Sequence, residues 1–365
     1  MRWSFALFRA AGTTVRIHVT FVLLLAWFGL VFYTRGGLAA TVAGLAYMLG
    51  LFGSVLLHEY GHALAARRYG IRTPDITLLP IGGVARLERL PDKPGQELVV
   101  AAAGPAVNVA IAAGLALLNV AAGRPALGDG PAMLTGALAT RLLWANLFLV
   151  GFNLLPAFPM DGGRILRAVL AMRHPFVDAT RTAALIGQGM AFLLGFAGLL
   201  FNPLLAFIAL FVYLGASGES SSVQLREATE GVPVRSAMLT DFIPVHPDAR
   251  LVEVAEHVLR TPQRAFPVMD AGGLVGLLTG EDIIKGLKDN GARARVADVM
   301  QSPPDRVTDG IPLSRALEIM QGRQCRPLLV VNEWDQPVGI LTCEHVGEFV
   351  TVQAALRSGA APALR

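Results

Sequence analysis

Long apolar runs, separated by short polar segments, dominate the first 220 residues of the chain. Each run approaches the roughly 20 apolar residues that an α-helix needs to cross a bilayer. The pattern therefore predicts a polytopic α-helical membrane domain with about six transmembrane helices, at residues 17–34, 38–66, 98–121, 142–158, 183–200 and 204–218. The Asn202-Pro203 pair marks the turn between the last two runs.

The pattern changes after Gly218, where a polar segment begins and short β-rich runs then alternate with helical ones. Residues 245–282 recur as residues 307–345, so the second half of the chain contains an internal repeat. Two such units are expected to bury a face against each other in a soluble α/β module. We predict a membrane domain at 1–218, a linker at 219–231, the repeated module at 232–352 and a tail at 353–365.

Composition agrees with a multi-pass membrane protein, because 53% of the residues are hydrophobic, 16% are charged and the mean hydropathy is +0.53. The first run is too long for the core of a signal peptide, so we expect it to remain in the protein. Cations flank alternate ends of the runs, which predicts that both termini lie in the cytoplasm. We expect the chain to lie in the cell inner (plasma) membrane. These flanks account for the net charge of +4, and no nucleic-acid partner is expected. They are Arg2, Arg9, Arg16, Arg67, Arg68, Arg72, Arg86, Arg89, Lys93, Arg164, Arg167, Arg173 and Arg181.

The second apolar run ends in the sequence His58-Glu59-Tyr60-Gly61-His62. On a helix this spacing places two imidazoles one turn apart on one face, where both can bind the same zinc ion. Glu59 can then accept a proton from water bound to the metal. In a soluble chain the motif would indicate an ordinary metalloprotease. Here it lies beside the membrane interior, where ionisable groups are costly and by default functional.

A catalytic zinc site needs a third protein ligand and an open fourth position. The best candidate is Asp161, in a segment that closes the fourth apolar run and contains two prolines and a diglycine. Irregular backbone at membrane depth is tolerated only where protein or a water-filled cavity covers it. A buried carboxylate there needs a cation, although a helix-capping or turn role is the structural alternative.

Three motifs in this region resemble the site-2 proteases, a family of intramembrane zinc metalloproteases. Residues 58–62 match the family's zinc-binding motif, residues 153–164 match its Asn-x-x-Pro-x-x-Pro-x-Asp-Gly-Gly pattern, and residues 104–108 match its Gly-Pro-x-x-Asn element. The resemblance covers residues 1–220. It implies one Zn²⁺ per chain, held by His58, His62 and Asp161, with Glu59 as the catalytic base.

The resemblance also implies roles for residues around the metal. Asn153 would face the reacting carbonyl and stabilise its oxyanion, whereas the structural alternative is a hydrogen bond between helices. Gly104, Pro105 and Asn108 would contact the substrate, or alternatively allow close helix packing and a kink.

Residues 75–88 contain two β-rich runs about Gly82-Gly83, which indicates a hairpin. The segment is too short and too broken to span a membrane. It is either a plain surface hairpin or a membrane-associated one whose free edge pairs with an extended substrate. The second use is attractive because the amide groups of a substrate helix are bonded internally until the helix opens.

Each copy of the repeated module resembles a CBS domain, and the pair would form one Bateman module over residues 232–352. The resemblance implies nucleotide contacts from the Gly-x-x-Thr-x-x-Asp element, at Thr279 and Asp282 in the first copy and at Thr342 in the second. The second copy has His345 in place of the Asp. An adenine nucleotide, ATP or AMP, is the expected ligand, while packing or homodimer contact is the alternative.

The predicted function is intramembrane zinc-dependent proteolysis of transmembrane or membrane-adjacent peptides near the cytoplasmic leaflet. Family resemblance suggests anti-sigma factors, sigma-factor precursors or remnant signal peptides as substrates, and nucleotide binding to the CBS pair as regulation. A CBS-regulated metal transporter or channel is the alternative from a different class. Cys325 and Cys343 are expected to be reduced thiols, because a cytoplasmic module meets a reducing environment.

Overall fold

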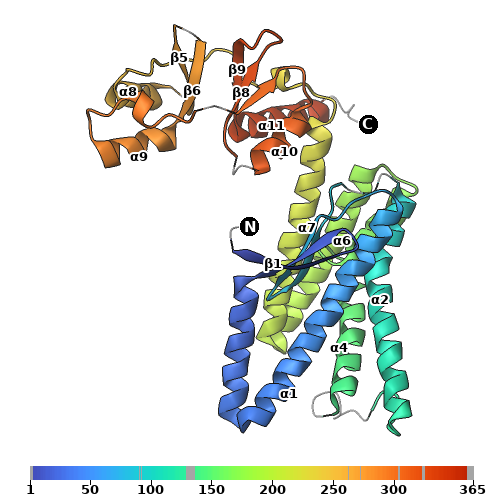
Figure 1. The fold of residues 1–365 in the computed structure, drawn as a ribbon. Coiled ribbons are helices and arrows are strands. Elements are labelled where there is room, and N and C mark those ends of the chain that lie inside the picture. Colours follow the sequence, from blue (N-terminus) through green and yellow to red (C-terminus); the bar gives the residue numbers. More distant parts are fainter. Residues whose placement is uncertain are drawn as a thin grey trace. The chain divides into compact units, whose positions relative to one another are not determined.

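The computed structural model describes residues 3–359, except 90, 92, 129–135, 262, 272, 303–304 and 323–324. The chain divides into two compact units, Met1–Val223 and Gln224–Arg365. The first unit is mainly helical and carries a small sheet, and the second combines helices with short strands (Figure 1).

Four helices in the described part of the chain are long and apolar enough to cross a membrane. They are α1 (Val19–Arg68), α2 (Pro94–Ala121), α6 (Phe176–Leu200) and α7 (Pro203–Thr229). Helix α1 has 50 residues and is interrupted at Gly36 and Gly37, whose backbone angles are non-helical, so that it forms two arms that cover the first two apolar runs (Figure 1). Helix α4 (Leu138–Asn153) covers most of the fourth run but has only 16 residues. The count of six spans therefore stays a prediction.

Large apolar side chains are exposed along these helices. On α6 and α7, for example, Phe192, Leu193, Leu199 and Phe207 are each more than 70% exposed. An apolar surface of this extent is unstable in water but is the normal surface of a helix in lipid. The buried faces instead carry small residues, such as Ala183, Ala184 and Gly187 on α6, which let helices approach closely.

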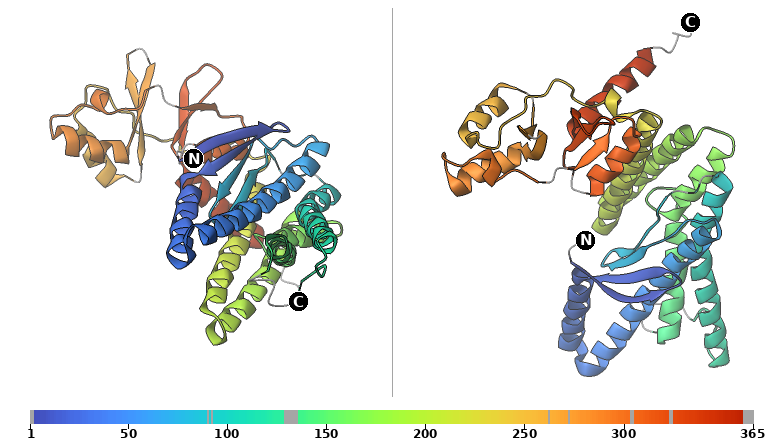
Figure 2. Two further views of the ribbon diagram at one scale, coloured as in Figure 1. Left: turned by 60° about the horizontal axis from the view of Figure 1, so that its bottom comes forward. Right: turned by 45° about the horizontal axis from the view of Figure 1, so that its top comes forward.

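A four-stranded sheet in the order β1-β2-β3-β4 packs on α1 (Figure 2). Strands β1 (Ser4–Ala10) and β2 (Thr13–His18) form an N-terminal hairpin that the apolar pattern did not predict. The predicted second hairpin is confirmed as β3 (Asp75–Leu79) and β4 (Gly82–Arg86), which pair antiparallel. Strand β3 pairs with β2 on one side and with β4 on the other, so β4 lies at an edge of the sheet.

Arg167, which the charge pattern counts as a flanking cation, has no exposed surface. It lies on α5 (Asp161–Ala171), where its guanidinium donates to Glu97 of α2, at 2.9 Å from Nε, and to Glu219 of α7. Phe158 and Phe176 cover the guanidinium plane. The side chain therefore joins three helices instead of lying at the membrane surface.

The second unit contains two similar halves, each with its own apolar core. The first half comprises α8 (Leu251–Arg260), β5 (Ala265–Asp270), β6 (Gly273–Thr279) and α9 (Gly280–Asn290). The second half comprises β7 (Arg306–Thr308), α10 (Leu313–Gly322), β8 (Leu328–Val331), β9 (Pro337–Leu341) and α11 (Cys343–Gly359). Two short 3₁₀ turns also pack on these cores. Val234 of η1 (Val234–Ser236) belongs to the core of the second half, and Val296 of η2 (Val296–Asp298) belongs to the core of the first half. A third cluster buries Ala265 and Leu277 of the first half against Leu329, Val331 and Ile340 of the second, as expected for a doubled module.

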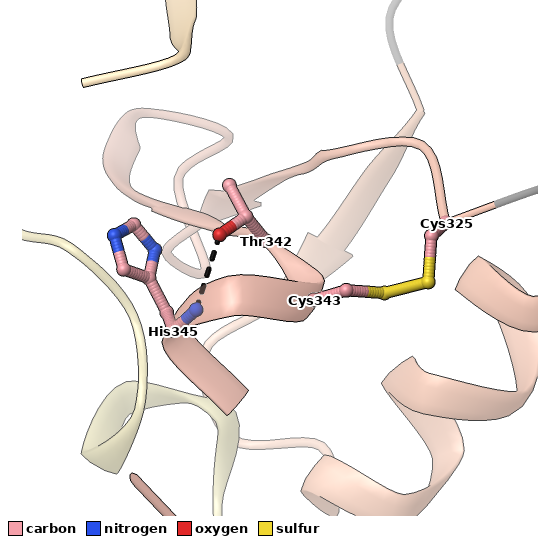
Figure 3. The surroundings of a disulfide bond; sticks show 4 residues. All are labelled: Cys325, Thr342, Cys343 and His345. Carbon is pink, nitrogen blue, oxygen red and sulfur yellow. Dashed lines mark hydrogen bonds between the residues drawn. A yellow bond between two sulfur atoms is a disulfide. The ribbon is translucent and has the colours of Figure 1, made fainter. Parts of the chain in front are cut away.

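The prediction of two reduced cysteines is wrong for this structure, in which Cys325 and Cys343 form a disulfide (Figure 3). The two residues are 18 positions apart, but β8 and β9 are neighbouring antiparallel strands in which Leu328 pairs with Leu341. Cys325 precedes one paired end and Cys343 follows the other, so both lie at the same end of the hairpin. A reducing cytoplasm favours thiols, but the pairing of β8 with β9 brings the two sulfur atoms within bonding distance.

Candidate metal centre and substrate cavity

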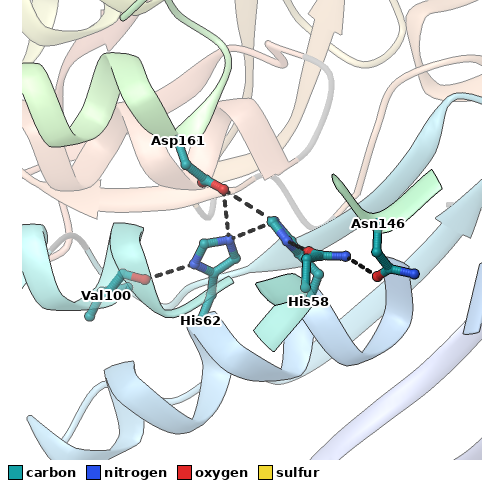
Figure 4. A network of polar contacts seen from close by, with 6 residues as sticks. His58, His62, Val100, Asn146 and Asp161 are labelled. Carbon is teal, nitrogen blue, oxygen red and sulfur yellow. Dashed lines mark hydrogen bonds and ion pairs between the residues drawn. The ribbon is translucent and has the colours of Figure 1, made fainter. Parts of the chain in front are cut away.

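Three potential metal ligands converge between α1 and α5 (Figure 4). His58 and His62 lie one turn apart on the same face of α1, and Asp161 is the first residue of α5. The Nε2 atoms of the two imidazoles are 3.1 Å apart, and Asp161 Oδ2 lies 3.1 Å and 3.2 Å from them. All three residues are at least nine-tenths buried.

The dimensions of this triangle fit a zinc ion. Tetrahedral ligands at about 2.1 Å from zinc lie about 3.4 Å from one another, so each observed edge is within a few tenths of an ångström of that spacing. Asp161 completes the set with a carboxylate oxygen, a common zinc ligand beside imidazole nitrogens.

The backbone before α5 explains how Asp161 reaches the metal position. A Cβ atom at Gly162 would lie 2.2 Å from the carbonyl oxygen of Leu155, and one at Gly163 would lie 2.6 Å from the backbone of Ala157. Only glycine permits this close return of the chain. The diglycine thus places the start of α5, with its carboxylate, directly after the irregular proline segment.

The second nitrogen of each imidazole also has a fixed partner. His62 Nδ1 lies 2.7 Å from the carbonyl oxygen of Val100, and His58 Nδ1 is hydrogen-bonded to Asn108 Oδ1. Both acceptors are oxygens, so each Nδ1 carries the proton and each Nε2 lone pair points to the metal position. Hydrogen bonds of this kind fix the orientation of metal-binding histidines and raise their basicity.

A chain of buried amides continues behind His58. The Nδ2 group of Asn108 donates to Asn146 Oδ1 at 2.7 Å, and Asn146 Nδ2 donates to Ser54 Oγ at 3.1 Å and to the Leu142 carbonyl at 2.8 Å. Asn108 and Asn146 have no exposed surface. Neither Asn146 nor Ser54 was predicted from the sequence, although a lone Asn within an apolar run is a signal that could have identified Asn146.

Gly104 on α2 faces the imidazoles. A Cβ atom at this position would lie 2.3 Å from His62 Nε2 and 2.7 Å from His58 Nε2. Its missing side chain therefore leaves room for the metal centre. Neither Gly104, Pro105 nor Asn108 is among the described residues that line the cavity beside the metal centre, so their predicted contact with substrate stays a prediction.

That cavity, of about 370 Å³, joins one face of the metal centre to the edge of the sheet. His58, Glu59 and Asn153 line it together with Gly82 and Gly83 of β4. A Cβ atom at Gly83 would lie 2.6 Å from Glu59 Cγ, so glycine here allows the edge strand to approach the glutamate. The remaining lining is mostly apolar and comprises Leu51, Phe52, Val55, Pro80, Ile81, Phe148, Leu149 and Phe152.

A second cavity, of about 640 Å³, lies in the CBS-like unit. Its lining includes Thr279 and Asp282 of the first copy and Thr342 of the second, together with Arg264 and Arg326. The two copies differ locally. In both copies the threonine Oγ1 accepts the backbone amide three residues on, from Asp282 at 3.3 Å and from His345 at 3.2 Å (Figure 3). In the first copy Asp282 Oδ2 also accepts the Thr279 hydroxyl, at 2.6 Å.

Comparison with known proteins agrees with this division of the chain. The family model described as Peptidase family M50 matches residues 46–123 and 128–195, and the CBS domain model matches residues 234–289 and 296–349. A zinc metalloprotease of Methanocaldococcus jannaschii is 36% identical over 305 residues, which cover 83% of this chain and 84% of that one. The protein Rip3 of Mycobacterium tuberculosis is 31% identical over 378 residues, which cover 96% and 94% of the two chains.

Among solved structures, the site-2 protease from Methanocaldococcus jannaschii is 37% identical, with a TM-score of 0.44, over 60% of this chain and 95% of that one. The sequence matches define a membrane-embedded metallopeptidase joined to a CBS pair. The chain belongs to peptidase family M50. It is a zinc metalloprotease of the site-2 protease type that carries two CBS domains, which confirms the resemblance found in the sequence.

Proposed function

We propose that the cavity beside the metal centre is the active site of an intramembrane endopeptidase that cleaves transmembrane or membrane-adjacent peptides near the cytoplasmic leaflet. One observation carries the proposal: His58, Glu59 and Asn153 line a single cavity together with the edge strand at Gly82 and Gly83. Such an arrangement brings a metal ligand, a base and an extended-chain binding edge together. A metal transporter needs the ligands but has no evident need of Glu59 or of the edge.

In this proposal His58, His62 and Asp161 hold one zinc ion per chain. Bound zinc supplies a Lewis acid that polarises the scissile carbonyl and makes water more acidic. Glu59 accepts the proton of the attacking water and returns it to the leaving amine. The amide of Asn153 stabilises the negative charge that develops on the carbonyl oxygen.

The free edge of β4 receives the substrate. Once a transmembrane helix unwinds, its backbone amides and carbonyls need new partners, since the membrane interior offers no water. An edge strand presents a row of such groups and can pair with an extended peptide. The close approach of Gly83 to Glu59 supports this role, because the scissile bond of a peptide on β4 would then lie within reach of the base.

The decisive test is Glu59→Gln, which keeps the shape of the side chain but cannot accept the proton. We expect cleavage to fall by about 10²–10⁴-fold with zinc content unchanged, while the His58→Ala, His62→Ala double variant loses zinc. N-terminal profiling of membrane peptides from cells with wild-type or Glu59→Gln protein would then identify the substrates; anti-sigma factors, sigma-factor precursors and remnant signal peptides remain the candidates. Near-normal cleavage by Glu59→Gln protein would refute the mechanism.

We further propose six spans with both termini in the cytoplasm, a membrane domain at 1–218, a linker at 219–231, a CBS pair at 232–352 and a tail at 353–365. The asymmetry of Lys and Arg supports this orientation, even with Arg167 removed from the count. Reporter fusions after Gly123 and after Gly218 should report opposite sides of the membrane. The same side for both would contradict the six-span topology.

Nucleotide binding by the CBS pair is a second proposal. The cavity of about 640 Å³ supports it, because Thr279, Asp282 and Thr342 line it together with two guanidinium groups that suit phosphate. Calorimetry on the full-length protein should detect ATP or AMP, and Asp282→Asn should weaken binding. Asp289→Asn, on the exposed part of the same helix, is the matched control. Absence of nucleotide binding would leave homodimer contact as the role of the pair.

A further inference from the structure

A separate cavity, of about 390 Å³, lies on another face of the helix that carries the metal ligands. Tyr60, Ala63 and Arg67 of α1 form one wall. The N-terminal hairpin contributes the turn at Ala11 and Gly12 together with Arg9 and Thr13, and the segment after α1 contributes Arg72 and Thr73. Neither the zinc site nor the proposed substrate cavity uses Arg9, Arg67, Arg72 or Thr73.

The charges around this cavity are unbalanced. Arg9, Arg67 and Arg72 line it and Glu88 is its one acidic lining residue, which leaves a formal excess of two positive charges. Within the described residues none of the three guanidinium groups forms an ion pair. Arg67 is held in place by a 3.0 Å hydrogen bond to the carbonyl of Ala11. Guanidinium groups grouped without a counter-charge favour an anion, and their forked geometry suits phosphate oxygens.

A neutral donor accompanies the arginines. Thr73 is 6% exposed, and its Oγ1 atom has no hydrogen-bond partner among the described residues. A buried hydroxyl without a partner is costly, so each such group requires an explanation. Thr73 lines the cavity; its hydroxyl oxygen has almost no exposed surface in this conformation and would donate to a phosphate oxygen after a rotation about χ1.

The surroundings indicate where that phosphate comes from. On the hairpin that forms one side of the cavity, Trp3, Phe5 and Leu7 are 68%, 65% and 59% exposed. Exposed apolar residues favour lipid over water, and Trp in particular is enriched at the headgroup level of a bilayer. Arg67 is in the last turn of α1, where a span leaves the apolar layer. The cavity therefore lies at the depth of lipid phosphates.

We propose that this cavity binds a phosphate group, and that in the membrane the phosphate belongs to the headgroup of an anionic phospholipid. Arg9 and Arg72 supply charge-assisted contacts, and the Thr73 hydroxyl donates a further hydrogen bond. Because Tyr60 lies between Glu59 and His62 in the sequence and lines the cavity, the lipid contacts the helix at the level of the catalytic groups.

The test measures retention of phosphatidylglycerol by the purified full-length protein, using native mass spectrometry in detergent. Arg72→Gln should weaken binding about tenfold, the typical effect of losing a charge-assisted hydrogen bond. Arg68→Gln is the matched control, because Arg68 is an exposed neighbour on α1 that does not line the cavity. Glu88→Gln should have the opposite effect and strengthen binding, since it removes the one opposing charge.

Thr73→Val separates ligand binding from a structural role. The hydroxyl has no protein partner, so the variant should melt at the same or a higher temperature than the wild type yet bind phosphatidylglycerol about threefold less tightly. Equal lipid retention by the Arg72→Gln and Arg68→Gln variants would overturn the proposal, and so would a lower melting temperature in Thr73→Val protein with unchanged lipid binding. Binding of inorganic phosphate with the same variant pattern, but without retention of phosphatidylglycerol, would keep the phosphate site and remove the lipid assignment.

Discussion

Replacing Asn146 tests whether the amide chain behind His58 supports the metal centre. Asn146→Leu removes the acceptor of the Asn108 Nδ2 group and the donor to Ser54, at a position with no exposed surface. The Asn108 side chain then loses the contact that fixes its orientation. If it rotates by half a turn, its NH₂ group faces the protonated Nδ1 of His58, and two donors oppose each other.

The expected size of the effect follows from these contacts. A buried donor left without a partner costs about 1–3 kcal/mol. Loss of an outer-shell partner of a metal ligand typically lowers metal affinity by about 10–100-fold. Asn146 acts through Asn108 and not on His58 directly, so we expect the lower end, about a tenfold loss of zinc affinity.

Zinc affinity is measured by competition with a chelator, and the absorption spectrum of the cobalt-substituted protein reports the ligand geometry. Asn119→Leu is the matched control, because Asn119 is also fully buried on a membrane helix and bonds to Ala126 and Thr140, away from the metal centre. Both variants should lose stability, and only Asn146→Leu should lose zinc affinity and change the cobalt spectrum. Equal zinc affinity in the two variants would refute the reasoning.

Three further outcomes are expected. Gly104→Ala should abolish zinc binding, because the added methyl group overlaps the imidazole nitrogens of His58 and His62. Gly114→Ala on the same helix is the control and should bind zinc normally, since no atom lies within 4 Å of the added carbon. Metal analysis of both purified variants decides this. Arg167→Met should destabilise the membrane unit by about 3–5 kcal/mol, because it leaves the Glu97 carboxylate buried without its partner. The measurement is a lower melting temperature, and an unchanged one would contradict the buried Arg167–Glu97 pair. The disulfide between Cys325 and Cys343 should leave the non-reduced protein without thiols that can be alkylated, since the chain has only two cysteines. Full alkylation of protein taken directly from cells would contradict the disulfide.

The three potential metal ligands were predictable because metal binding depends on residue type and short spacing. His58 and His62 need only a helix to share a face, and the irregular proline and glycine segment isolates Asp161 as a buried carboxylate. The hairpin at residues 75–86 was predictable for the same reason, since its strands and turn are contiguous.

The contacts between distant segments were not predictable in this way. Asn146 is 38 residues from Asn108 and 92 from Ser54, so its place in an apolar run marks it as a buried polar residue but does not show which residues it bonds to. Arg167 fits the pattern of a flanking cation until helix packing brings two glutamates to it. The disulfide likewise depends on the pairing register of β8 and β9, which the spacing of the cysteines does not reveal.

The two cavities on different faces of α1 have a thermodynamic consequence. His58 and Glu59 line the one beside the metal centre, and Tyr60, the next residue, lines the arginine-rich one. If occupancy of the second changes peptide affinity at the first by some factor, linkage requires the peptide to change lipid affinity by the same factor. The lipid that copurifies with the protease would then vary with substrate load, and lipid composition would set the threshold at which proteolysis begins.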